Sequence, residues 1–162
     1  MNILDFNDIY NENKKLDKIF LENYGNSEDI ILKNKLELLV ELGELCNESK
    51  CFKYWSRKEA NRELVLEEYA DVLLMIFYFF RELDVSLNEN FPKENNLDLI
   101  DEFIYLFNII SRFRYEYNKD IIKDIFINTL RLGKMLNFSF DEIKNSCLNK
   151  INIDKERFNI DY

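Results

Sequence analysis

The chain has 162 residues, with 31 acidic and 22 basic side chains, a net charge of −9 and a pI near 4.7. This length suits one domain with a buried core, so we treat residues 1–162 as a single domain. The negative charge argues against binding to nucleic-acid polymers or to anionic membranes. Because three glycines and one proline leave few turn formers for a sheet, the composition predicts an all-α bundle of about six helices.

No segment has the pattern of an export signal or a membrane span. The N-terminal residues, MNILDFN, include no basic region ahead of an apolar stretch. The longest nearly apolar run, Tyr69 to Phe80, is too short to cross a bilayer. Cys46, Cys51 and Cys147 follow no ligand or disulfide spacing, and the chain has no histidine to activate a catalytic thiol. We therefore expect reduced cysteines, a cytoplasmic protein and no membrane partner.

The first two predicted helices are bounded by turn and capping residues. Apolar residues at helical spacing predict a helix from about Asp5 to Tyr24, and Gly25 is expected to end it. Ser27, followed by Glu28 and another acidic residue, has the character of an N-cap, so the second helix is expected to begin there.

A capping-box pattern marks the start of the third helix. Ser56 and Glu59 form S-x-x-E, which predicts a helix that begins at Ser56 or a turn later and runs to about Leu83. The next stretch, Val85 to Asn96, contains the only proline and four asparagines. We expect it to be the longest loop.

Two further helices are predicted, from about Leu97 to Tyr115 and from about Asp120 to Asn137. Both are more apolar around their circumference than one monomeric core requires, and aromatic residues make up 15% of the chain. This apolar surplus predicts a homo-oligomer, most simply a twofold homodimer.

The second helix carries a line of glutamates. Members of this line recur at i, i+4, i+7 and i+11, so they share one side of the helix. One interpretation is a mostly buried helix whose narrow solvated face is acidic. Like charges at this spacing repel, however, and no lysine is interleaved along the line to relieve the repulsion, which favours a functional role. The glutamate line consists of Glu37, Glu41, Glu44 and Glu48.

A second acidic pair, Glu68 and Asp71, lies at the start of the apolar run, which Asp71 alone interrupts. A carboxylate there is neutral, paired with a cation or bound to a metal, because an unpaired buried charge costs several kcal/mol. The nearest basic residues in the sequence, Arg62 and Arg81, lie about two helical turns or more away. We therefore favour a metal site over a neutral acid or a long-range ion pair.

Two antiparallel helices would bring the acidic pairs face to face. Four oxygen ligands in a chain without histidine favour Mg²⁺ or Mn²⁺ over Zn²⁺. Mg²⁺ held by carboxylates and by substrate oxygens is typical of chemistry on phosphates. The predicted ligands are Glu41, Glu44, Glu68 and Asp71.

A basic and aromatic segment joins the two acidic helices. Residues 50–58, KCFKYWSRK, contain four basic side chains and the only tryptophan, Trp55. Such a segment can hold phosphate oxygens, for example through Lys53, and stack a ring on a base. The alternative is a solvated connector anchored by one aromatic residue.

Three stretches together resemble a known family: VELGELCNE at 40–48, CFKYWS at 51–56 and LEEYAD at 66–71. They resemble the dimeric, all-helical dUTPases, relatives of the MazG-like nucleotide pyrophosphohydrolases. An E-x-x-E helix followed by E-x-x-D is shared across that superfamily, whereas FKYWS is typical of the dUTPase branch. The resemblance implies that the four acids are the metal ligands, that Glu41 or Glu44 is the catalytic base, and that Trp55 lines the base pocket.

The resemblance also implies nucleotide contacts elsewhere in the chain. In NKKLD, Asp17 matches the family pattern Q-x-x-L-D/N, and Asn13 or Lys14 stands in place of the glutamine. Leu74 occupies the position of a base-contacting histidine in the family. This difference weakens the prediction of the substrate more than that of the reaction.

The C-terminal stretch resembles the family's ending only in part. Lys150 and Arg157 are retained and are candidate phosphate ligands, with an ordinary solvated tail as the alternative. Ile151 and Asp154 stand where the family has two asparagines, so Asp154 is a candidate substrate contact of altered chemistry.

These features predict an Mg²⁺-dependent enzyme that cuts dUTP between its α and β phosphates, giving dUMP and pyrophosphate. A water activated by metal and one carboxylate would attack in line. One alternative is the same reaction on dCTP, dUDP or a nucleotide with a modified base. The others are a non-catalytic relative that senses nucleotides or binds a protein, and a structural helical protein without a site.

Overall fold

We analysed a computed structural model, which describes residues 2–25, 29–113 and 115–160, with side chains through Arg157. Over these residues the chain is all-helical and has no strand, so the predicted fold class is confirmed. Ser27 and Glu28, the predicted start of the second helix, lie outside the described residues. The elements are η1 (Ile3–Phe6), α1 (Asn7–Tyr24), α2 (Ile30–Ser49), α3 (Arg62–Glu82), α4 (Leu99–Phe113), α5 (Lys119–Met135) and α6 (Phe140–Ile160).

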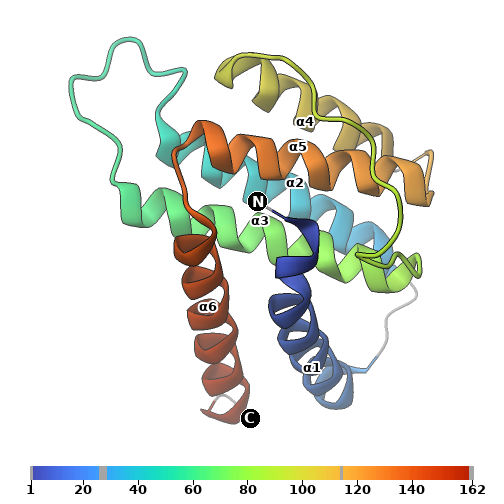
Figure 1. Cartoon of the computed structure of the whole chain (residues 1–162). Coiled ribbons are helices and arrows are strands. Elements are labelled where there is room, and N and C mark those ends of the chain that lie inside the picture. Colours follow the sequence, from blue (N-terminus) through green and yellow to red (C-terminus); the bar gives the residue numbers. More distant parts are fainter. Residues whose placement is uncertain (1, 26–28, 114, 161–162) are drawn as a thin grey trace.

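Two antiparallel helix pairs form the body of the molecule, and two further helices project from it (Figure 1). α2 packs on α3, and α4 packs on α5, while α2–α4 and α3–α5 contacts join the two pairs. α1 and α6 both contact α3 and also contact each other. They extend from the same side of the body.

α3 is the central helix because it is apolar on most of its circumference. Its phenylalanines are fully buried and meet the aromatic rings of η1 and α5; the ring centroids of Phe77 and Phe126, for example, lie 5.8 Å apart. The hydroxyl of buried Tyr69 donates to the Thr129 carbonyl at 2.9 Å. Gly133 makes room for this ring, since a Cβ there would lie 2.6 Å from the Tyr69 oxygen.

Several predicted helix ends are correct, and one predicted start is wrong. α1 ends at Tyr24, followed by Gly25 with φ of 70°, as expected. α3 does not begin at Ser56 or a turn later: it begins at Arg62 and is capped by Asn61. The Asn61 side chain accepts hydrogen bonds from two backbone amides of the first turn, at 3.0 and 3.4 Å. Asn61 therefore supplies the cap that the S-x-x-E pattern was expected to supply.

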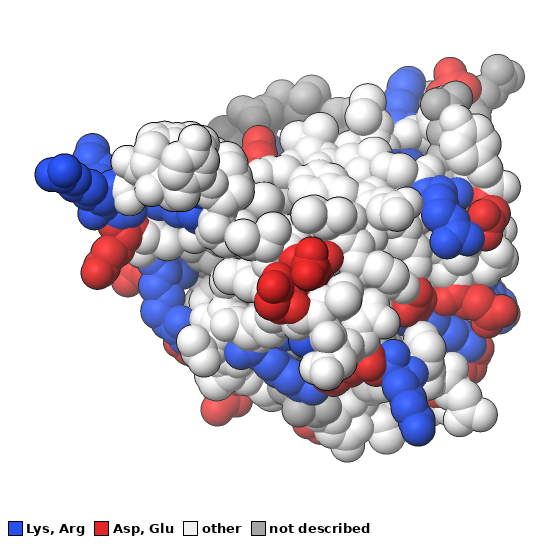
Figure 2. Space-filling model, turned by 90° about the horizontal axis from the view of Figure 1, so that it is seen from above, with Lys and Arg blue, Asp and Glu red and all other residues white. Residues whose placement is uncertain are grey.

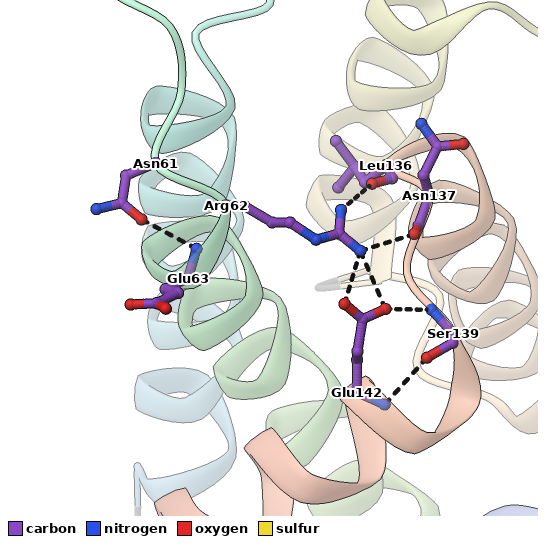
Figure 3. A network of polar contacts seen from close by, with 7 residues as sticks. All are labelled: Asn61, Arg62, Glu63, Leu136, Asn137, Ser139 and Glu142. Carbon is purple, nitrogen blue, oxygen red and sulfur yellow. Dashed lines mark hydrogen bonds and ion pairs between the residues drawn. The ribbon is translucent and has the colours of Figure 1, made fainter.

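Arg62 fixes the start of α6 relative to the start of α3 (Figure 3). Its guanidinium donates to the carbonyls of Leu136 and Asn137, at 3.3 and 2.8 Å, and forms an ion pair with Glu142 at 2.8 Å. Glu142 also accepts the Ser139 amide at 2.8 Å. These bonds lower the pKa of Glu142 to about 2, the Ser139 amide being the larger cause and Arg62 the next. The network sets the direction in which α6 leaves the body.

None of the described helices combines the length and apolarity that a membrane span requires.

Candidate active site

α2 presents three different faces. One face packs into the core, and the glutamate line occupies a second. The third face is apolar but open to solvent, with Leu36 64% exposed and Val40 49% exposed. Gly43 continues this open face, and no atom lies within 4 Å of the position its Cβ would take. The core residues are Leu38, Leu42 and Leu45.

Carboxylates from α2 and α3 converge at the middle of the helix pair. Oxygen atoms of Glu41, Glu44 and Glu68 lie within 4.8 Å of one another. None of the three forms an ion pair with a lysine or arginine of the described chain. The antiparallel arrangement therefore brings three of the four predicted ligands together.

Burial and mutual repulsion make the ionised carboxylates of the cluster unfavourable. Burial raises the pKa of Glu41 to about 7, and Asp71 and Glu44 add to the shift by repulsion. Burial also raises the pKa of Glu68, again with Glu44 and Asp71 contributing. Groups that repel one another in this way gain most from a shared cation. The electrostatics therefore favour a site that binds positive charge.

Asp71 lies beside the cluster and has a cationic partner of its own. Its Oδ2 accepts a hydrogen bond from the ammonium of Lys150, a residue of α6, at 2.8 Å. Burial raises the pKa of Asp71, and the bond to Lys150 opposes that shift. The sequence left a long-range ion pair open as an alternative, and Asp71 forms one with Lys150. The three glutamates form no ion pair with a described residue.

A cavity of about 990 Å³ opens beside the cluster, between α1, α2, α3 and α6. Glu41 and Asp71 line its wall at the acidic end. Six of the eight residues predicted to contact substrate also line it. They are Asn13, Asp17, Leu74, Lys150, Asp154 and Arg157.

The other two predicted contacts, Lys53 and Trp55, do not line this cavity. They lie on the segment between α2 and α3, which projects from the body (Figure 1). Trp55 is 63% exposed, and its ring meets those of Phe52 and Tyr54 edge-on. Within one chain, the aromatic segment is therefore separate from the cavity, and its role in binding stays a prediction.

The residues that differ from the family pattern lie in two environments, the wall of the cavity and the buried core. Leu74 is 8% exposed and contributes apolar surface to the cavity. Ile151 is 1% exposed and belongs to the core, so it does not face the cavity. Asp154 does line the cavity and is paired with Arg157 at 3.6 Å.

Sequence reasoning missed several charged residues that line the cavity, among them Arg81. It had been considered only as a distant basic residue, but it lines the cavity and forms an ion pair with Asp17 of α1. Its position ten residues after Asp71 places it on the same side of α3. That spacing indicated its location, but nothing in the spacing predicts that α1 packs against this side of α3.

A comparison with protein-family models matches residues 5–162 to a dUTPase family. The chain belongs to this dUTPase family. It is the all-helical, MazG-like group, so the predicted resemblance is confirmed over nearly the whole chain. No curated protein and no solved structure matched.

Membership of the dUTPase family identifies the general chemistry. The chain is of a nucleotide pyrophosphohydrolase type whose substrates are nucleoside triphosphates. The structure places the acidic cluster at one end of the cavity and cationic side chains of α6 nearby.

Proposed function

We propose that this member of the dUTPase family is an Mg²⁺-dependent dUTP pyrophosphatase, which hydrolyses dUTP to dUMP and pyrophosphate in the cytoplasm. One observation carries the proposal. The carboxylate cluster of α2 and α3 adjoins, through Glu41, a cavity lined by basic residues of α6 and polar residues of α1. A nucleoside triphosphate has the matching polarity, with its phosphates at one end and a polar base at the other.

The donor set fits Mg²⁺, with Mn²⁺ as the second choice. Glu41, Glu44 and Glu68 offer oxygens that are close together and lack cationic partners in the described chain, and Asp71 adjoins them. Hard carboxylate oxygens are the ligands that these ions prefer. When bound, the ion would neutralise phosphate charge and lower the pKa of a coordinated water.

Glu41 is the better candidate for the general base. It lines the cavity, whereas Glu44 does not, and its pKa of about 7 is suited to accept a proton near neutral pH. In the proposed reaction, Glu41 takes a proton from a water whose oxygen forms a bond to the α-phosphorus. The bond between that phosphorus and the oxygen bridging to the β-phosphate breaks, and pyrophosphate leaves.

Lys150 and Arg157 are placed to bind the phosphates. Both line the cavity from α6, and Lys150 already reaches the acidic end through Asp71. An ammonium near the cluster would stabilise the negative charge that develops on the leaving group. Asp154, between them on the helix, restrains Arg157 by an ion pair at 3.6 Å.

Pyrophosphate release from dUTP with and without Mg²⁺ tests the proposal. We expect Glu41→Gln and Asp71→Asn to abolish release. Glu116→Gln is a matched control, because Glu116 is an exposed carboxylate that pairs with Arg112 of its own segment. Retention of activity in the first two variants would show that the cluster is not the catalytic site.

The apolar wall contributed by Leu74 supports one alternative, the same reaction on another nucleotide. A panel of dUTP, dCTP, dUDP and nucleotides with modified bases distinguishes the substrates. Tight binding of a nucleotide with Mg²⁺ but without turnover would instead indicate a nucleotide-sensing relative.

We also propose that the chain is a homodimer, with the open face of α2 as its interface. Leu36 and Val40 are exposed there, α2 packs against α4, and α4 carries the exposed apolar residues Ile100 and Ile104. Figure 2 looks onto the side that carries α4 and shows a mostly uncharged surface with one small acidic group near its centre. Contiguous exposed apolar surface of this kind marks an association site.

Gly43 supports the same face. A glycine within a helix costs up to about 1 kcal/mol relative to alanine, yet nothing in the described chain approaches it. Close contact with a second copy would account for it. Val40→Glu should convert the dimer to a monomer in analytical ultracentrifugation, whereas the control Asp141→Lys, a charge reversal at an exposed position in the first turn of α6, should leave it dimeric.

A further inference from the structure

The end of the cavity opposite the acidic cluster is built around a cation. Asp71, Leu74, Tyr78 and Arg81 follow one another at i, i+3, i+7 and i+10 along α3, and all four line the cavity. They form a single stripe about 15 Å long, at 1.5 Å per residue. The cavity is therefore acidic at one end and carries a guanidinium at the other.

Arg81 is held by two residues of α1. Its side chain is 13% exposed, forms an ion pair with Asp17 and lies over the ring of Tyr10, with the guanidinium carbon 5.7 Å from the ring centroid. Tyr10, Asn13 and Asp17 share one side of α1, at i, i+3 and i+7. Because Arg81 contacts the first and last of these, Asn13 lies next to it.

Two polar atoms at this end lack partners within the described chain. Asn13 is 4% exposed and lines the cavity, and its Oδ1 has no hydrogen-bond partner. The Nη1 of Arg81 is likewise buried without one. Such groups are rare, because leaving a buried donor or acceptor without a partner is unfavourable. A purely structural ion pair would leave both atoms unexplained.

We infer that Arg81 is a specificity-determining residue, which selects nucleotides whose base presents a carbonyl rather than an amino group at this end of the cavity. The inference rests on the proposed function and deepens it by naming the base class. Asn13 Oδ1 would accept the N3–H of uracil, and Arg81 Nη1 would donate to an adjacent carbonyl oxygen of the same ring.

The preference for uracil over cytosine follows from the hydrogen-bond donors and acceptors that each side chain offers. A guanidinium has donors only, whereas an amide such as Asn13 can turn to offer either a donor or an acceptor. Uracil has a carbonyl where cytosine has an amino group. Arg81 therefore cannot bond the amino group of cytosine, and Asn13 alone would not separate the two bases.

The ion pair with Arg81 occupies the Asp17 carboxylate, and this strengthens the preference for uracil over cytosine. This carboxylate could accept an amino group, but Arg81 already engages it. Removing the guanidinium both deletes the donor for uracil and releases an acceptor for cytosine. The two effects change the preference in the same direction.

The experiment measures binding of dUMP and dCMP by calorimetry, and kcat/KM for dUTP and dCTP with Mg²⁺, in four proteins: wild type, Arg81→Gln, Arg81→Lys and Arg112→Gln. Lysine also has donors only, so Arg81→Lys should keep the preference for uracil. Arg81→Gln should lower the ratio of dUMP to dCMP affinity roughly ten- to a hundredfold. Arg112 is an exposed arginine outside this cavity, and its variant should match wild type.

The outcomes separate this inference from the proposed function. Equal effects of Arg81→Gln on both nucleotides, or none, would overturn the role of Arg81. Failure of the wild type to release pyrophosphate from any nucleotide would overturn the proposed function, while the binding ratios would still decide on Arg81. If Arg81→Gln does not fold, Asp17→Asn with Arg81→Gln removes both charges and is expected to show the same lowered ratio.

Discussion

The ammonium of Lys150 lies 2.8 Å from Oδ2 of Asp71, so the last helix places a positive charge at the edge of an otherwise anionic cluster. The two residues are 79 positions apart in the chain. Lys150 thereby occupies the position of a counter-ion for Asp71, and it also lines the cavity in which phosphates are expected.

Replacing this counter-ion should destabilise the protein and make it more responsive to Mg²⁺. The pair is only partly buried, with side chains 31% and 17% exposed, so we expect Lys150→Gln to cost about 1–2 kcal/mol, between exposed and buried pairs. Mg²⁺ should raise the Tm of Lys150→Gln more than that of wild type, because the ion supplies the missing charge. An equal rise in both proteins would contradict this account. Activity on dUTP should also fall.

Glu41→Gln should stabilise the metal-free protein while abolishing catalysis. Glu41 is repelled by Asp71, Glu44, Glu37 and Glu68, and its burial is also unfavourable. A neutral amide of the same shape removes these costs, so the Tm without Mg²⁺ should rise. Functional sites commonly carry such a cost. A lower Tm in Glu41→Gln would show that the carboxylate has a structural partner that we have not identified.

The Arg62–Glu142 junction should make stability sensitive to acid. The pKa of Glu142 is lowered to about 2 in the folded protein, from 4.5. Its contribution is therefore fully present above about pH 4.5 and is lost as the pH falls toward 2. Urea unfolding at a series of pH values should show wild type and Glu142→Gln converging over this range. Glu116→Gln, at an exposed pair remote from the junction, serves as the control.

Gly133→Ala should destabilise the core. Its Cβ would lie 2.6 Å from the Tyr69 oxygen and 2.8 Å from the ring carbon that carries it, and Tyr69 is fully buried. Forcing a methyl group into such a contact costs about 1–3 kcal/mol. Tyr69→Phe, which loses the hydrogen bond to Thr129, should cost about 1 kcal/mol. Urea unfolding measures both, and a neutral Gly133→Ala would mean that the ring can move freely.

Local patterns in the sequence were sufficient for the helical fold and for the convergence of the acidic pairs. Spacing of i, i+3 and i, i+4 placed the glutamates of α2 on one side. The antiparallel packing of α2 and α3 then brought Glu41 and Glu44 close to Glu68. The start of α3 was mispredicted because Ser56 and Asn61 are both good caps, and the sequence does not show which one the chain uses.

The remaining features of the site depend on helices that are distant in sequence. Lys150 pairs with Asp71, and Arg81 pairs with Asp17. Predicting these two ion pairs requires knowing how α6 and α1 pack against α3. No periodicity within one helix contains that information. For the same reason, the position of Trp55 outside the cavity could not be inferred from its neighbours in the sequence.

α2 has a core face, an acidic face and an open apolar face, which leaves almost none of its surface uncommitted. Random substitutions in α2 should therefore be poorly tolerated on every side of the helix, and for a different reason on each. Selection for folding, for activity and for assembly would each be expected to purge its own subset of positions, so a mutational scan sorted by phenotype should show three stripes that repeat with the helical turn.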